Sequence, residues 1–161
     1  MKTAIVYYSL EGNTRYVVDM IAKNIDADVI EIISKKKYPA SGPLKYVIGG
    51  KDASTGATPK IMPVEFDSDK YECIIFATPV WASSFAPPLK TFINQYKDQL
   101  KNKKFGFYAG YKGSGFDKAT EKMAAELGIE SFENTLYLVD PMLESAPEKD
   151  QAIIEFANSF K

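Results

Sequence analysis

Five short apolar runs along the chain have the composition of buried β-strands. They are rich in Val, Ile, Tyr and Phe and nearly continuous in apolar character, which is typical of parallel strands covered on both faces. The runs are Ala4–Tyr8, Val29–Ile33, Cys73–Thr78, Phe105–Ala109 and Thr135–Val139. This pattern predicts five strands of a parallel sheet.

Helical stripes follow four of these runs. Apolar residues recur at 3.6-residue spacing, which indicates helices that bury one face. The stripes begin near Val17, Leu89, Phe116 and Ile153. The alternation of strands and helices predicts an α/β fold with right-handed crossovers. A chain of 161 residues suits one domain, spanning residues 1–161.

The stretch from residue 39 to residue 65 interrupts the alternation. It contains four Gly and four Pro, and within it only Leu44–Ile48 has the pattern of a short helix. We interpret it as a long, partly irregular crossover, because a separate domain would need a core of its own. This crossover either covers one face of the sheet or serves as a lid or partner surface.

The amino-acid composition excludes several classes of function. The chain has 20 Lys and Arg against 21 Asp and Glu, a net charge of −1, so it lacks the positive excess of a nucleic-acid-binding protein. Histidine is absent and Cys73 is the single cysteine, which excludes histidine-based catalysis and clustered cysteine or histidine metal sites. No apolar run approaches the length of a membrane span. We expect a cytoplasmic protein without membrane insertion, whose redox chemistry needs a cofactor.

The loop after the first strand has the residues of a phosphate site. It reads Ser9-Leu10-Glu11-Gly12-Asn13-Thr14 and leads directly into a helix. Glycine permits a tight turn, the short polar side chains supply hydrogen bonds, and a helix N-terminus favours an anion. The segment predicts a site for a phosphate monoester, with an ordinary helix cap as the alternative. It is neither a P-loop nor a GxGxxG motif.

Two other loops leave the same predicted edge of the sheet, where open α/β sheets bind ligands. The loop after the third strand carries Trp81, the single tryptophan. Its ring either stacks on a planar heterocycle or packs beneath the crossover. The loop from Ala109 to Phe116 contains three glycines, so its main chain can approach a flat ligand closely.

These motifs resemble those of the flavodoxin-like FMN-binding proteins. Ser9–Thr14 is similar to the family's hydroxyl-x-x-Gly-x-Thr phosphate loop. Thr78-Pro79-Val80-Trp81, followed by Pro88-Leu89-Lys90, is similar to flavodoxin-fold reductases and quinone oxidoreductases. The resemblance implies a three-layer, doubly wound, five-stranded parallel sheet in the order 2-1-3-4-5, with FMN at its carboxyl edge. By position it implies phosphate contacts from Ser9, Leu10, Glu11, Gly12, Asn13 and Thr14, and ring contacts from Thr78, Pro79, Val80, Trp81, Ala109, Gly110, Tyr111 and Gly115.

Two departures from that pattern bear on function. Glu11 places a carboxylate beside a phosphate dianion, so either its side chain points outward or phosphate binding is weakened. We expect Arg15, the only arginine, to be the candidate that offsets this charge. The loop from Thr78 to Ala86 contains no glycine, and Pro79 stiffens it.

The resemblance implies an FMN-binding electron-transfer protein that shuttles electrons between redox partners. The alternative is an NAD(P)H-dependent FMN or quinone oxidoreductase of the same fold, and a non-redox binding domain is a third hypothesis. The expected partners are a redox protein or a small-molecule electron acceptor, with NAD(P)H as a further candidate.

Overall fold

A computed structural model describes residues 2–40, 42–111, 115–139 and 146–161. Its main feature is a parallel sheet in the order β2-β1-β3-β5-β6. These strands span Thr3–Tyr7 (β1), Ala27–Glu31 (β2), Cys73–Trp81 (β3), Lys104–Tyr111 (β5) and Asn134–Val139 (β6). Counted along the chain, the five parallel strands lie in the order 2-1-3-4-5, which confirms the predicted sheet.

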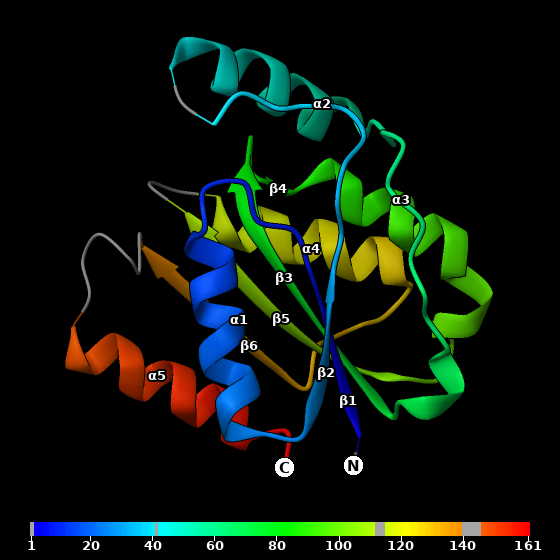
Figure 1. Ribbon diagram of the computed structural model, residues 1–161, viewed down its shortest axis with the longest axis vertical. Coiled ribbons are helices and arrows are strands. Elements are labelled where there is room, and N and C mark those ends of the chain that lie inside the picture. Colours follow the sequence, from blue (N-terminus) through cyan, green and yellow to red (C-terminus); the bar gives the residue numbers. More distant parts are fainter. Residues whose placement is uncertain (1, 41, 112–114, 140–145) are drawn as a thin grey trace.

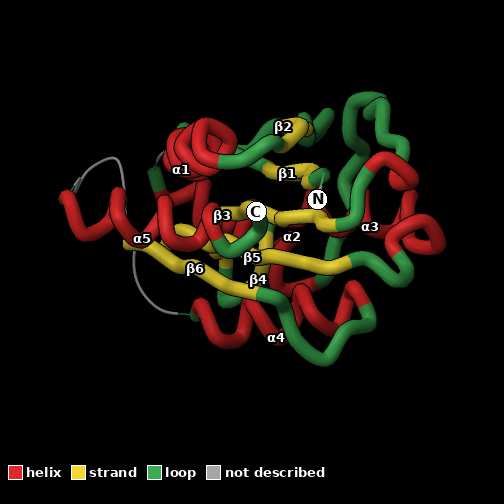
Figure 2. Tube along the Cα trace, turned by 90° about the horizontal axis from the view of Figure 1, so that it is seen from below, coloured by secondary structure: helices red, strands yellow, loops and turns green. Residues whose placement is uncertain are grey.

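Helices cover both faces of the sheet, so the molecule has three layers (Figures 1 and 2). On one face lie α1 (Asn13–Asn24) and α5 (Pro147–Asn158), which contact each other. On the other lie α3 (Pro87–Tyr96), continued by a 3-10 turn over Lys97–Leu100, and α4 (Phe116–Leu127). A short 3-10 turn, Ser68–Lys70, precedes β3. None of these described helices combines the length and apolar character needed to cross a bilayer.

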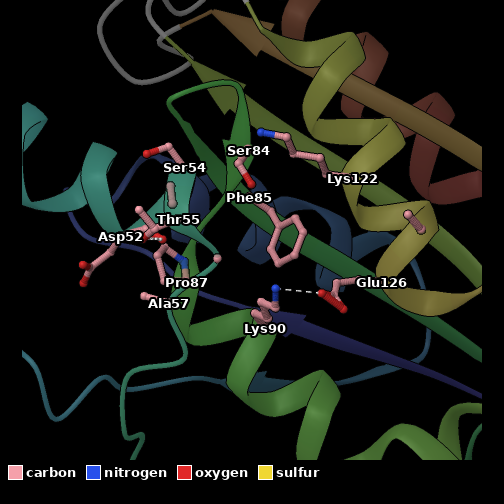
Figure 3. A pocket seen from close by; sticks show the side chains of 13 residues that line it. Asp52, Ser54, Thr55, Ala57, Ser84, Phe85, Pro87, Lys90, Lys122 and Glu126 are labelled. Carbon is pink, nitrogen blue, oxygen red and sulfur yellow. Dashed lines mark hydrogen bonds and ion pairs between the residues drawn. The ribbon is translucent and has the colours of Figure 1, made fainter.

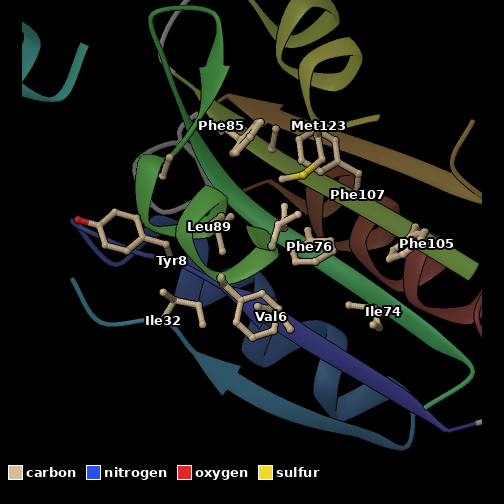
Figure 4. Packing of buried hydrophobic residues seen from close by; sticks show 14 of the residues in the cluster. Val6, Tyr8, Ile32, Ile74, Phe76, Phe85, Leu89, Phe105, Phe107 and Met123 are labelled. Atoms are coloured by element: carbon tan, nitrogen blue, oxygen red, sulfur yellow. The ribbon is translucent and has the colours of Figure 1, made fainter. Parts of the chain in front are cut away.

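Each face of the sheet has its own apolar core, because successive strand residues point to opposite sides. Ile5 and Ile75 pack with α1 and α5. Val6 and Phe76 pack with α3 and α4, in the aromatic-rich cluster of Figure 4. All four side chains are fully buried. Because both faces are covered, the ends of the strands and their loops are the parts of the sheet left for a ligand.

Gly106 of β5 marks a close approach between the sheet and the last helical segment. A Cβ atom at this position would lie 2.4 Å from Cζ of Phe160, inside van der Waals contact. The Phe160 ring therefore occupies the space that a side chain would take. It is 2% exposed and packs against Phe156 at 5.0 Å between ring centroids.

The crossover between β2 and β3 is more helical than predicted. A π-helical turn over Lys45–Gly49 (η1) continues directly into α2, Gly50–Thr55, whereas the sequence indicated only Leu44–Ile48. The prediction failed because the Gly49-Gly50 pair has the pattern of a helix break. This helical segment lies across the carboxyl edge of the sheet (Figure 1).

The segment after β3 is a hairpin, where the sequence predicted a loop. β3 continues three residues past Thr78 to Trp81, and a two-residue strand β4, Ser84–Phe85, returns antiparallel to it. The two turn residues, Ala82 and Ser83, have φ values of 48° and 57°. Both lie in the left-handed region, as a type I′ turn requires. Residues other than Gly, Asn and Asp rarely adopt this backbone conformation.

Candidate functional site

Three loops meet at the carboxyl edge of the sheet because they leave neighbouring strands. Tyr8, just before the first loop, donates a backbone hydrogen bond to the carbonyl of Ala77 at 3.2 Å. On the next strand, Thr78 pairs with Ala109 and Pro79 with Gly110. The structure therefore brings the predicted phosphate loop and both predicted ring loops together at one edge.

The phosphate loop ends at the N-terminus of α1, where the Ser9 side chain bonds to the first turn of the helix. Gly12, the N-cap of α1, has a φ of 96°, and the first turn of the helix contains no acidic residue. The Ser9 hydroxyl oxygen accepts hydrogen bonds from the backbone N–H groups of Gly12 and Arg15, at 3.2 and 3.3 Å. The helix dipole favours an anion at this end. A short glycine-containing turn at a helix N-terminus fits a phosphate group.

The partner of Glu11 comes from the crossover. Its carboxylate forms an ion pair with Lys45, and the two side chains keep 25% and 14% of their surfaces exposed. Arg15, which we expected to offset this charge, forms ion pairs with Asp19 and Glu31, both at 4.0 Å. No local sequence pattern indicates Lys45, because 34 positions separate it from Glu11.

Thr78 fixes the base of the hairpin. It is fully buried, and its hydroxyl accepts a hydrogen bond from the backbone N–H of Ala86 at 2.8 Å and donates one to the carbonyl of Pro79 at 2.8 Å. These bonds hold the two ends of the β3–β4 turn together. Pro79 and Val80, both partly buried, lie between Thr78 and the turn.

Trp81 packs beneath the crossover, one of the two arrangements left open by the sequence. It is 8% exposed, and its ring makes edge contacts with Tyr8 and Tyr38 at 5.6 and 5.1 Å between centroids. A Cβ on Gly49 would lie 3.2 Å from Cε3 of the indole, so the backbone of the crossover adjoins the ring. Stacking of Trp81 on a planar ligand stays a prediction.

The third loop contacts the hairpin. A Cβ on Gly115 would lie 2.9 Å from Cα of Ser83, so only glycine permits this approach, and its φ of 109° has the same requirement. A Cβ on Gly110 would lie 2.7 Å from the Tyr108 hydroxyl. The backbone of Tyr111 belongs to β5, but its side chain and residues 112–114 of the predicted loop lie outside the described residues.

A pocket of about 410 Å³ lies beside the hairpin, away from the phosphate loop (Figure 3). The Phe85 ring points into it, and Ser84 and Pro87 belong to the same wall. An ion pair of 3.0 Å between Lys90 of α3 and Glu126 of α4 crosses its lower part. The end of α2 forms the opposite wall. The volume of this pocket is within the range of small-molecule binding sites.

Burial keeps two weakly acidic groups neutral, Tyr8 at the carboxyl edge of the sheet and Cys73 at the start of β3. Burial raises the pKa of Tyr8 to about 12, so its hydroxyl stays protonated beside Trp81 at neutral pH. Burial also raises the pKa of the Cys73 thiol to about 11. Within the described ranges, no group of three or more acidic or cysteine side chains is placed to hold a metal ion.

Comparison with known proteins identifies a family by sequence. The model of a family described as NADPH-dependent FMN reductase matches residues 1–132. The comparison with curated proteins found no match.

Comparison with solved structures shows the fold. A flavoprotein from Lactobacillus acidophilus NCFM, in complex with FMN, is 24% identical with a TM-score of 0.70, and the match covers 94% of this chain and 97% of that one. A WrbA-like flavodoxin from Agrobacterium tumefaciens is 17% identical, with a TM-score of 0.62 and coverage of 98% and 94%. Two-electron reduced flavodoxin from Megasphaera elsdenii is 18% identical, with a TM-score of 0.56 and coverage of 97% and 98%. The fold is flavodoxin-like, as the sequence predicted.

Proposed function

Because the chain belongs to the NADPH-dependent FMN reductase family, we propose that it is an FMN-dependent oxidoreductase that takes electrons from NADPH and passes them to a small-molecule acceptor. Family membership supports FMN, the cofactor implied by the sequence motifs. Bound FMN supplies the redox chemistry, and the protein supplies binding, orientation and exclusion of water.

The phosphate of FMN would be held by the loop Ser9–Thr14. The N-terminus of α1, which has no acidic residue in its first turn, and the left-handed turn at Gly12 support this placement. The ring would lie against the hairpin residues Thr78–Trp81 and the β5 end from Ala109 to Gly115, the residues implied by the sequence resemblance. Their adjacency at one edge supports a single cofactor site.

The stiffness of the hairpin is the observation that favours a reductase over a one-electron carrier. Thr78 ties the hairpin at its base by accepting a hydrogen bond from the backbone N–H of Ala86. A carrier that stabilises one-electron reduction benefits from a peptide that can reorient near the ring, and glycine makes such a change easy. This segment has no glycine, and Pro79 fixes its own φ. A site that does not rearrange suits two-electron transfer.

A reductive titration distinguishes the two functions. The purified protein would be loaded with FMN, desalted, and reduced stepwise without oxygen while its visible spectrum is recorded. Reduction in one two-electron step, with NADPH consumed when a quinone is added, supports the reductase. Two resolved one-electron steps and no NADPH oxidation would favour the electron-transfer protein first predicted. Failure to retain FMN would contradict both.

The phosphate position can be tested with Gly12→Asp. An added carboxylate at the N-terminus of α1 should repel the phosphate and lower FMN affinity at least about tenfold. Gly128→Asp is the matched control, because Gly128 also has a positive φ, 68°, and open space around it at the far end of α4. Unchanged FMN affinity in folded Gly12→Asp protein would place the phosphate elsewhere.

A further inference from the structure

The crossover makes two contacts with the candidate cofactor site. Lys45 forms its ion pair with Glu11 in the phosphate loop, and Gly49 adjoins the indole of Trp81 in the ring loop. Positions 45 and 49 are four residues apart in one continuous helical segment, so they face the same side. Both contacts are therefore directed at the carboxyl edge of the sheet that this segment crosses (Figure 1).

Glu11 is an electrostatic obstacle within the proposed phosphate loop. Glu11 directly precedes Gly12, the residue at the N-terminus of α1. Two like charges a few ångströms apart repel each other by about 1–4 kcal/mol near a protein surface. The neutral donors of the loop, Ser9, Asn13 and Thr14, do not cancel a carboxylate. A loop with this composition alone would bind a phosphate dianion weakly.

Lys45 removes that obstacle by its position. Its ammonium group is placed against the Glu11 carboxylate, and 14% of the lysine side chain is exposed, so solvent screens the pair incompletely. The neighbouring cation Arg15 is engaged with Asp19 and Glu31. The charge that balances Glu11 is thus delivered by a segment that is remote in sequence.

We propose that Lys45 is a positioning residue that makes the Ser9–Thr14 loop selective for phosphorylated flavin, because it neutralises Glu11 and holds the crossover over the loop. The inference rests on the proposed function, since it takes FMN as the ligand. It assigns the crossover a role in the site, where the sequence left open whether it was a cover, a lid or a partner surface.

The test measures the affinities of FMN and riboflavin, which differ only by the phosphate. Both would be titrated at one low ionic strength, with quenching of flavin fluorescence as the readout. Lys45→Gln should weaken FMN binding about tenfold and leave riboflavin binding unchanged. Lys45→Arg should retain wild-type FMN affinity. Lys51→Gln is the matched control, because Lys51 is an exposed lysine of the same helical segment.

A double variant separates neutralisation from direct contact. If Lys45 acts through Glu11, FMN affinity should return to the wild-type value in Glu11→Gln/Lys45→Gln protein. A loss that persists in the double variant would overturn the proposal, because Lys45 would then act on the phosphate itself. Equal losses for FMN and riboflavin would also overturn it, since they would show a packing role only.

The wild-type titration separates the failure of this inference from that of the proposed function. If wild-type protein binds no FMN, the proposed function fails first. If it binds FMN and Lys45→Gln binds it equally well, only the role of Lys45 fails. The thermal midpoint of each variant confirms that the variant is folded. Glu11→Gln breaks the same ion pair from the other side, because it removes the carboxylate that Lys45 contacts.

Discussion

Replacing Ala82 with glycine should stabilise the protein, because Ala82 is held in a conformation that suits glycine. Its φ of 48° is in the left-handed region, where the methyl group crowds the backbone. Ala82 is exposed, so removing its methyl group gives up little buried surface. The substitution therefore isolates backbone strain from packing.

The expected change in the free energy of unfolding has two opposing contributions, the backbone strain of alanine and the chain entropy of glycine. A left-handed conformation costs an L-residue such as alanine roughly 1–2 kcal/mol. Glycine also has more conformational freedom in the unfolded chain, which lowers the free energy of unfolding by roughly 0.4–1 kcal/mol. The net increase in the free energy of unfolding is about 0.8 kcal/mol, which corresponds to about 2 °C in the thermal midpoint for a domain of this size.

Urea denaturation of ligand-free protein measures this difference directly. Ala125→Gly is the matched control: Ala125 is also exposed, but it lies inside α4. There glycine should lower the free energy of unfolding by about 1 kcal/mol. The same chemical change is thus expected to have opposite signs at the two positions. Destabilisation of similar size at both would refute the left-handed turn at Ala82.

Three further predictions concern Asp52, Phe160 and Trp81. Hydrogen bonds from Lys36 and Tyr38 outweigh the effect of burial and lower the pKa of Asp52. The stability that this carboxylate contributes is present above its unfolded pKa of about 3.9 and is lost as the pH falls below that value, so the urea midpoint of Asp52→Asn should fall less steeply than that of wild type between pH 5 and 3. Phe160→Ala should lower the free energy of unfolding by about 3–5 kcal/mol in urea denaturation, because the ring fills the space above Gly106. Tryptophan fluorescence should be quenched when FMN is added. Unchanged fluorescence would show that Trp81 does not lie against the flavin ring.

The core and the sheet order could be predicted because their signals are local. Apolar runs such as the one around Ile75 identify strands, and their alternation with amphipathic stripes determines the layers. The ends of the strands were less predictable. β2 spans Ala27–Glu31, whereas the apolar run suggested Val29–Ile33. Pairing with β1 sets the register of this edge strand, and Ile33 remains half exposed.

The site was predictable only in outline. The hairpin was missed because Ala82-Ser83 lacks the glycine or asparagine that normally indicates a type I′ turn. The ion pair of Lys45 with Glu11 was missed because it depends on where a long crossover folds back, and a side-chain contact across 34 positions has no periodic signal. The roles assigned to individual residues of the three loops stay predictions until FMN binding is measured.

The position of β1 between β2 and β3 has a consequence for folding kinetics. Thr3 pairs with Ala27, 24 residues later, and with Cys73, 70 residues later. Closing the longer loop costs about 1 kcal/mol more chain entropy, so the β1–β2 pair is expected to form before β3 docks. The carboxyl edge, which needs both neighbours, is then completed late. A ligand held there should slow unfolding and leave the folding rate nearly unchanged.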